Sequence, residues 1–307
     1  MSLVDQAIQQ MTGVTKAVIP AAGWGTRLLP ATKAIPKEMV PVMDRPVIQW
    51  AVEEAARAGL DDICIVTSRS KSAIEDHFDT APELEEVLER KDKAEALAAV
   101  RRSSALARLT YTRQASALGL GHAVAQARDH VGGDPFAVLL PDVVLEPGSP
   151  ALTDMVAAYK RTYCSILALV AVPPDEVSQY GCAAVQPVDG GGNLVRVTGV
   201  VEKPMPDEAP SNLTLAGRYV LTPSVMEALG RTTPSAGGEI QLTDAIDAVI
   251  RSSEPVYGLV VDGGIHDTGS VLGLLEANLS FALFDPTLGQ AVRKMMHDRL
   301  SGLGVGE

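Results

Sequence analysis

The sequence predicts an α/β fold in which helices flank a mixed, mainly parallel sheet. An apolar run at 17–22 ends at a glycine, as is usual for a buried parallel strand that enters a tight loop. Apolar positions then recur at helical spacing over 46–58. Pro46 suits the first helical turn, and Gly59 suits the stop. A second apolar run at 63–67 completes a βαβ unit, the building block of parallel sheets.

The alternation of strands and helices continues to about residue 150 and then becomes irregular. Residues 82–107 are rich in Glu, Lys, Arg, Leu and Ala, which favours a helix with an apolar stripe at Leu84, Val87 and Leu88. The irregular second half predicts a smaller β-rich part on the same sheet. The other expected elements are a strand at 109–112, a helix from about 119, a strand at 136–142, a helix to about 161, strands at 165–172, 182–186, 194–202 and 214–221, helices at 223–230 and 242–250, a strand at 256–261, and helices after 267.

Composition narrows the class of partner. The chain has 307 residues, 46% of them hydrophobic and 21% charged, which is typical of a globular protein. Its formal net charge of −12 disfavours a nucleic-acid or anionic-membrane surface, because phosphates need a clustered positive field. No apolar stretch approaches the ~20 residues of a membrane span. The three cysteines show no CxxC spacing, so we expect a reduced, cytoplasmic protein.

The glycine-rich segment after the first strand predicts a phosphate site. Glycines at 23 and 25 would let backbone N–H groups approach an anion, and Arg27, Lys33 and Lys37 add positive charge nearby. A small phosphorylated molecule needs only such a local group of cations. The two glycines alone are weak support, because glycine also serves ordinary turns.

Two familiar phosphate-binding motifs do not fit this segment. The third glycine of the dinucleotide motif GxGxxG is replaced by Leu28, and the strand at 63–67 offers no acidic residue for a ribose diol. The ATP-binding P-loop is also excluded, because its glycine-lysine-serine/threonine ending is missing.

Residues 23–42 resemble the signature of the sugar nucleotidyltransferases, GxGTRxxPxTxxxPKxxxPV. Segments at 113–124, 139–145, 200–221 and 237–246 are similar to the bacterial members of this family that are uridylyltransferases of glucose 1-phosphate. The resemblance implies a Rossmann-like sheet and a reaction in which glucose 1-phosphate attacks the α-phosphorus of UTP with Mg²⁺ and releases pyrophosphate. It also suggests a homo-oligomer, a dimer or a tetramer.

The resemblance covers about residues 15–285 without a break, which predicts a single nucleotidyltransferase domain. Within it we expect a nucleotide-binding half at 15–150 and a sugar-binding half at 151–270. Residues 1–14 would form an N-terminal extension, and 286–307 a C-terminal helix and tail.

By position in the motifs, the resemblance implies catalytic roles for three cations. Arg27 and Lys37 would hold the triphosphate, and Lys203 would contact the phosphates of both reactants. Asp142 and Asp267 would hold one Mg²⁺, which prefers one or two carboxylates with phosphate oxygens and water. Surface ion pairs would also explain the cations, and turn or helix capping would also explain the aspartates.

The same resemblance places the remaining ligands. Backbone and amide groups would read the uracil edge, and glycines would leave room for glucose, whose hydroxyls Glu202 would bind. Turn formation would also explain the glycines. The expected nucleotide-binding residues are Ala22, Gly23, Gly25, Gln114 and Gly119, and the expected sugar-binding residues are Gly181, Glu202 and Gly217.

Two other functions remain open. A thymidylyltransferase acting on the same sugar phosphate differs by one methyl group on the base, which is worth only ~1–3 kcal/mol of discrimination. A non-catalytic sensor of nucleotide sugars could share the fold. Two positions depart from the family pattern, namely Trp24 between the loop glycines and Thr268 in a motif that often reads DCG.

Overall fold

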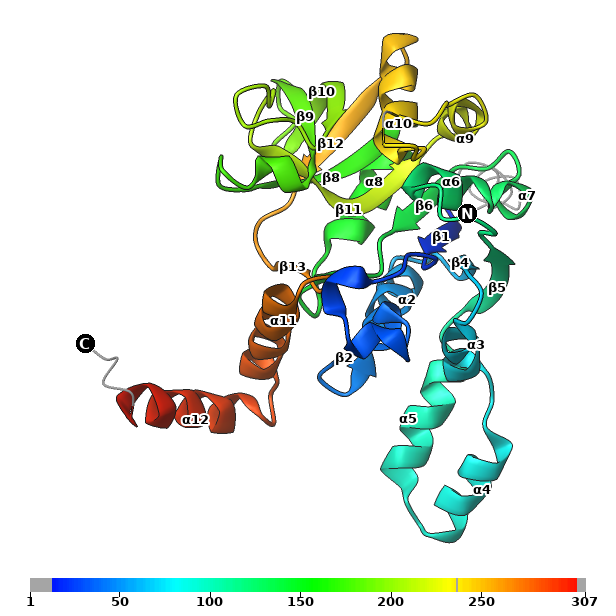
Figure 1. Ribbon diagram of the computed structural model, residues 1–307, viewed down its shortest axis with the longest axis vertical. Coiled ribbons are helices and arrows are strands. Elements are labelled where there is room, and N and C mark those ends of the chain that lie inside the picture. Colours follow the sequence, from blue (N-terminus) through cyan, green and yellow to red (C-terminus); the bar gives the residue numbers. More distant parts are fainter. Residues whose placement is uncertain (1–12, 236, 303–307) are drawn as a thin grey trace.

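The computed structural model describes residues 13–235 and 237–302 (Figure 1). The predicted extension at 1–14 lies almost wholly outside these residues, and so does the end of the predicted C-terminal tail. None of the described helices is long and apolar enough to cross a membrane.

Within the described residues, nine strands form one mixed sheet. Its strands are, in spatial order, β5 (Arg108–Arg113), β4 (Asp62–Thr67), β1 (Lys16–Pro20), β6 (Phe136–Leu139), β11 (Leu213–Leu221), β8 (Ser165–Ala171), β12 (Val256–Val260), β10 (Leu194–Glu202) and β9 (Gly181–Pro187). Two small ladders pair β2 (Pro41–Val42) with β3 (Arg45–Pro46) and β7 (Val143–Leu145) with β13 (Ile265–Asp267).

The sheet is parallel only in part. Neighbours among β5, β4, β1 and β6 run parallel, as the predicted βαβ pattern requires. In the second half β8 and β12 are parallel, but β11 is antiparallel to both β6 and β8, and β10 is antiparallel to β12 and β9. The prediction of a mainly parallel sheet is therefore wrong, because loops rather than α-helices connect β8, β9, β10 and β11 in sequence.

The second half curls on itself. Cys182 of β9 pairs with Thr214 of β11, although three other strands separate β9 from β11 in the sheet order. Figure 1 shows β8, β9, β10 and β12 gathered above β1, β4 and β5. The curl brings the start of β9 and the end of β10, which pair at Gly181 and Glu202, close to the start of β11.

Helices cover both faces of the sheet, and each face has its own core. Val18 of β1 points to the core shared with α6, α9 and α10, whereas Ala17 and Ile19 point to the core shared with α2 and α8, as strand alternation requires. The helices are α2 (Val47–Arg57), α3 (Ser72–Phe78), α4 (Pro82–Arg90), α5 (Ala94–Ser104), α6 (Leu120–Ala125), α7 (Arg128–Val131), α8 (Ala151–Thr162), α9 (Pro223–Leu229), α10 (Leu242–Arg251), α11 (Val271–Phe284) and α12 (Gly289–Gly302).

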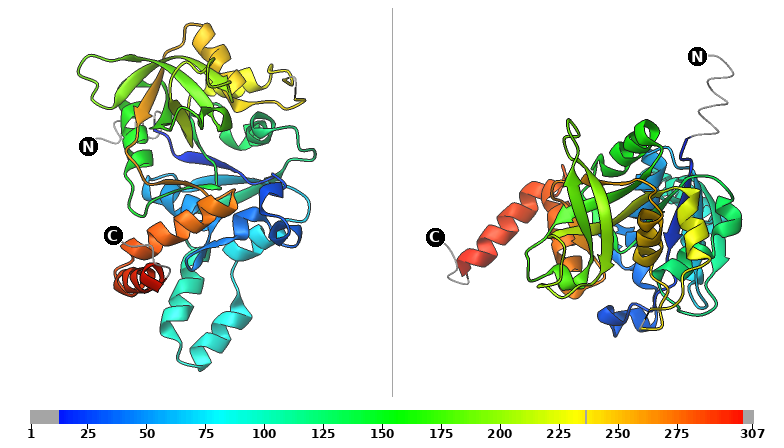
Figure 2. Two further views of the ribbon diagram at one scale, coloured as in Figure 1. Left: turned by 60° about the vertical axis from the view of Figure 1, so that its left-hand side comes forward. Right: turned by 90° about the horizontal axis from the view of Figure 1, so that it is seen from above.

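The predicted helix at 82–107 is two helices. The chain reverses between α4 and α5 at Asp92, whose φ of 51° cannot continue an α-helix. The expected apolar stripe is not part of the core, since no residue of α4 or α5 is buried and Leu84 is 48% exposed. Figures 1 and 2 show the pair projecting from the body of the protein, as α12 also does.

The two cores and the projecting helices predict unequal effects of the same substitution. Leu139→Ala on β6 removes a fully buried side chain and should lower the free energy of unfolding by roughly 2–5 kcal/mol. Leu84→Ala on α4 should change it by less than about 0.5 kcal/mol. Urea unfolding of both variants measures the difference, and similar losses for the two would contradict this assignment of the core.

Candidate active site

The glycine-rich loop follows β1 and folds back on itself through three short 3₁₀ turns, at Thr26–Leu28, Ala31–Lys33 and Lys37–Met39. Gly25 has φ of 67°, a backbone conformation that favours glycine. A Cβ at this position would also lie only 2.9 Å from Cβ of Lys37, so there is no room for a side chain. Thr32 Oγ1 donates to the Gly25 carbonyl at 2.7 Å. The glycines thus let the Lys37 side chain lie along the loop, where it also passes 3.8 Å from the position of a Cβ on Gly23.

A buried ion pair that the sequence does not reveal holds this loop from beneath. Lys71 Nζ donates to both carboxylate oxygens of Glu38, at 2.8 and 2.9 Å, and to the carbonyls of Ala21 and Gly23, both at 2.6 Å. Glu38 is fully buried. Burial raises the pKa of Glu38 and lowers the pKa of Lys71, so each charge depends on the other. Glu38 lies within the family signature, but no pattern singled out Lys71.

Both aspartates expected to bind metal lie against cations expected to bind phosphate. Lys37 Nζ is 2.5 Å from Asp142 Oδ2, and Arg27 Nη1 is 3.1 Å from Asp267 Oδ2. Burial opposes ionisation of Asp142, but the Lys37 ammonium holds the pKa of that carboxyl below its usual value. Burial alone would lower the pKa of Lys37, and Asp142 raises it. The Lys37–Asp142 pair is therefore charged near neutral pH.

The β7–β13 ladder places the two aspartates next to each other in the fold. Asp142 follows β6 and precedes β7, and Asp267, the last residue of β13, pairs with Val143. Thr268 donates to the Asp142 carbonyl from both its backbone N–H and its Oγ1, each at 2.8 Å. In the described part of the chain, no three His, Cys, Asp or Glu side chains gather as a metal site. Two carboxylates suit a hard cation such as Mg²⁺ that takes its other ligands from phosphate oxygens and water.

The residues expected to read the base lie at the same edge. Gln114 follows β5 and Ala22 follows β1, and the carboxyl ends of these parallel strands face one side of the sheet. Gln114 Nε2 donates to the Gly119 carbonyl at 3.1 Å and lies 2.9 Å from His122 Nδ1. A Cβ on Gly119 would lie 2.7 Å from the Ile240 carbonyl oxygen, so packing already requires glycine there.

A third group forms where β9 and β10 pair. Glu202 Oε2 accepts a hydrogen bond from Thr243 Oγ1 at 3.0 Å, and a Cβ on Gly181 would come within 3.2 Å of the same oxygen. Simple strand alternation would send Lys203 to the opposite face from Glu202. Instead Lys203 has φ of 45° and leaves the strand, so that its Nζ lies 3.7 Å from Glu202 Oε1.

Tyr180, which the sequence analysis did not select, links this group to the aspartates. Its carbonyl accepts from the Lys203 N–H at 3.1 Å. Burial and then the Asp267 carboxylate raise the pKa of Tyr180. Gly217, expected at the sugar, packs on the Asp142 turn: its φ is 67°, and a Cβ there would lie 2.9 Å from Val143 Cγ2.

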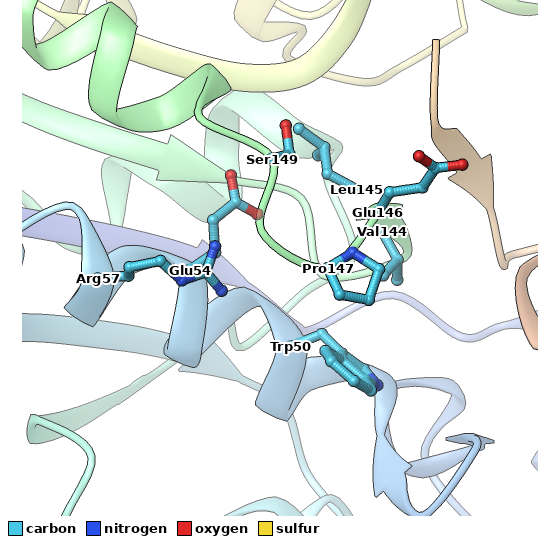
Figure 3. A pocket seen from close by; sticks show the side chains of 8 residues that line it. All are labelled: Trp50, Glu54, Arg57, Val144, Leu145, Glu146, Pro147 and Ser149. Atoms are coloured by element: carbon cyan, nitrogen blue, oxygen red, sulfur yellow. The ribbon is translucent and has the colours of Figure 1, made fainter. Parts of the chain in front are cut away.

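A depression with about 260 Å³ of empty space, open to solvent, lies between α2 and the segment after β7 (Figure 3). It contains none of the predicted site residues. The depression is lined by Trp50, Glu54, Arg57, Val144, Leu145, Glu146, Pro147 and Ser149.

Comparison with known proteins identifies the family of the chain. The family described as nucleotidyl transferase matches residues 16–282. A UTP–glucose-1-phosphate uridylyltransferase of Staphylococcus haemolyticus is 46% identical over 94% of this chain and 99% of its own length.

Solved structures give the same result. The UTP-bound UGPase from Acinetobacter baumannii is 42% identical, covers 93% of this chain and 99% of its own, and superposes with a TM-score of 0.85. A UDP-glucose pyrophosphorylase complexed with UDP-glucose is 40% identical over 86% of this chain and 97% of its own, with a TM-score of 0.78. This chain therefore belongs to the nucleotidyl transferase family.

Proposed function

We propose that this chain forms UDP-glucose and pyrophosphate from UTP and glucose 1-phosphate, as a UTP:glucose-1-phosphate uridylyltransferase. The observation that carries the proposal is the meeting of Lys37 with Asp142 and of Arg27 with Asp267 at the carboxyl edge of the sheet. Relatives that share 40–46% of its residues over most of the chain are named for this reaction or its product. Parallel strands at 15–150 would form the Rossmann-like, nucleotide-binding half, and the β-rich residues 151–270 the sugar-binding half.

The mechanism needs positioning and charge neutralisation rather than a protein nucleophile. Arg27 and Lys37 would hold the triphosphate and stabilise the pyrophosphate as it leaves. Lys203 would bind the phosphate of the sugar and the α-phosphate together, in line for displacement. Glu202, oriented by Thr243, would accept hydrogen bonds from the sugar hydroxyls.

Asp142 and Asp267 would hold the Mg²⁺. When bound there, the ion would neutralise phosphate charge that develops during the transfer. In the described structure each aspartate already balances one cation, so Lys37 and Arg27 lie beside the place where phosphates would enter. Ala22, Gly23 and Gly25 would bring the backbone close to the nucleotide, while Gln114 and Gly119 would contact the uracil edge.

The nearest competing function is transfer of thymidylate. With glucose 1-phosphate and Mg²⁺, we expect kcat/KM for UTP to exceed that for dTTP by roughly 10-fold or more, because a site shaped for uracil would have to accommodate the extra methyl group of thymine. Pyrophosphate release measured for both nucleotides tests this. A preference for dTTP would overturn the choice of base. UDP-glucose binding without pyrophosphate release would leave a sensor instead of an enzyme.

Asp142→Asn should separate a catalytic role from a structural one. The substitution keeps the shape of the side chain but removes the charge that faces both Lys37 and the proposed metal. We expect kcat/KM to fall ~100-fold with a much smaller loss of thermal stability. Asp189→Asn, on the exposed turn between β9 and β10, is the matched control and should change neither quantity. Unfolding in proportion to the lost activity would instead assign Asp142 a structural role.

We also propose that the chain acts as a homo-oligomer, a dimer or a tetramer. The helical pair α4–α5 and the C-terminal helices are the candidate contacts, and α4, α5 and α12 project from the body in Figure 2. Apolar side chains on α11 support this, since Val271, Leu272 and Leu275 are each more than half exposed. Light scattering during gel filtration should give two or four times the mass of one chain, and a single-chain mass would contradict the proposal.

A further inference from the structure

We propose that Arg218 is a positioning residue, whose buried guanidinium fixes the turn that presents Asp142 to the metal. The proposal rests on the proposed function, in which Asp142 is a metal ligand. Arg218 lies on β11 opposite Leu139, the last residue of β6, and is only 1% exposed. It would therefore act from beneath the site without touching a substrate.

The guanidinium grips the backbone on both sides of Asp142. Arg218 Nη1 donates to the Leu140 carbonyl at 3.0 Å, and Nη2 donates to the Val143 carbonyl at 2.8 Å. Because these two carbonyls enclose Asp142 along the chain, one rigid planar group sets both ends of its turn. Arg218 Nη1 also donates to the Gly217 carbonyl at 3.1 Å, and the same carbonyl accepts from the Leu140 N–H at 2.9 Å.

Glu54 supplies the opposite charge. Its carboxylate accepts from Arg218 Nε at 3.1 Å to each oxygen and from Nη2 at 2.8 Å. Burying a guanidinium without such a partner would be strongly unfavourable. Glu54 comes from α2 and lines the depression of Figure 3, so α2 is tied through Arg218 to the Asp142 turn.

Lysine could not replace this arrangement. Arginine offers five N–H donors in a fixed plane, and here they reach a carboxylate and three carbonyls on different sides. A lysine ammonium has three donors at one point. Arg218→Lys would therefore keep the charge beside Glu54 and lose the simultaneous grip on Leu140 and Val143.

The turn is held from the opposite side by Thr268, which follows the other proposed metal ligand. Its two hydrogen bonds to the Asp142 carbonyl complete the set, since the carbonyls of Leu140, Asp142 and Val143 now all have fixed donors. Hydrogen bonds from Arg218 on β11 and from Thr268, just after β13, thus fix the backbone around Asp142 and with it the position of the Asp142 carboxylate relative to Asp267. Loss of the Arg218 contacts should loosen that relation.

Metal affinity tests the proposal more directly than stability does. Mn²⁺, a paramagnetic probe of Mg²⁺ sites, is titrated into the full chain with saturating UDP-glucose, and free Mn²⁺ is measured by electron paramagnetic resonance. Arg218→Lys should weaken Mn²⁺ binding roughly 10- to 100-fold, the usual effect of removing a group that orients a metal ligand. The Mg²⁺ concentration for half-maximal pyrophosphate release should rise similarly, and excess Mg²⁺ should restore part of the rate.

The matched control is Arg45→Lys. Arg45 also pairs with a glutamate of α2, Glu53, at 2.9 Å, but its other contacts are with Asp44 and the ring of Trp50 rather than with the Asp142 turn. It should bind Mn²⁺ as the wild type does. If Arg218→Lys also binds Mn²⁺ normally while melting at a lower temperature, Arg218 serves packing alone and the proposal is wrong.

A second variant covers the case in which Arg218→Lys does not fold. Arg218→Met with Glu54→Leu removes both buried charges together, a replacement that cores often tolerate. This double variant should fold and still bind Mn²⁺ at least 10-fold more weakly than the wild type, and wild-type affinity would overturn the proposal. Failure of the proposed function is distinct, because then the wild-type chain itself would release no pyrophosphate.

Discussion

The shape of the glycine-rich loop, on which the candidate site depends, is set by the buried ion pair between Lys71 and Glu38. The Lys71 ammonium joins Glu38, which lies inside the loop, to the carbonyls of Ala21 and Gly23 at its start. Carbonyl groups turned inward toward Lys71 free the other side of the loop for N–H groups and for the Lys37 side chain. Because both charges are nearly inaccessible to water, breaking the pair would leave an uncompensated buried charge. The loop therefore has one favourable shape before any ligand arrives.

The charges in the site explain how an acidic protein can bind a highly anionic substrate. The net charge of −12 repels phosphates, but salt screens this repulsion for charges that are more than about 10 Å away. At contact distance the ligand would meet Arg27, Lys37 and Lys203. Two of these cations already neutralise Asp142 and Asp267, so the site is nearly balanced and none of its carboxylates is left to face the phosphates alone.

Local patterns were sufficient for most of the fold. The apolar runs of β1, β4 and β6 and the helical spacing of α2 predict those elements within a residue or two at most ends, because burial on both faces leaves a strong signal. The sequence did not predict the break at Asp92, because neither glycine nor proline marks it and both helices are exposed. The strands β7 and β13 were not predicted either, because three residues are too few to show the alternation of a strand.

The sequence by itself determined which residues are available for the chemistry: a glycine loop, the cations at 27, 37 and 203, and two aspartates far apart in the chain, all in the order of one family. Only the tertiary structure decided which of them meet, pairing Lys37 with Asp142 and Arg27 with Asp267. It also revealed the supports, Lys71 under the loop, Thr243 beside Glu202 and Arg218 behind Asp142. These residues carry no motif, because their roles come from contacts between segments up to 164 positions apart, and such contacts exist only once the sheet has formed.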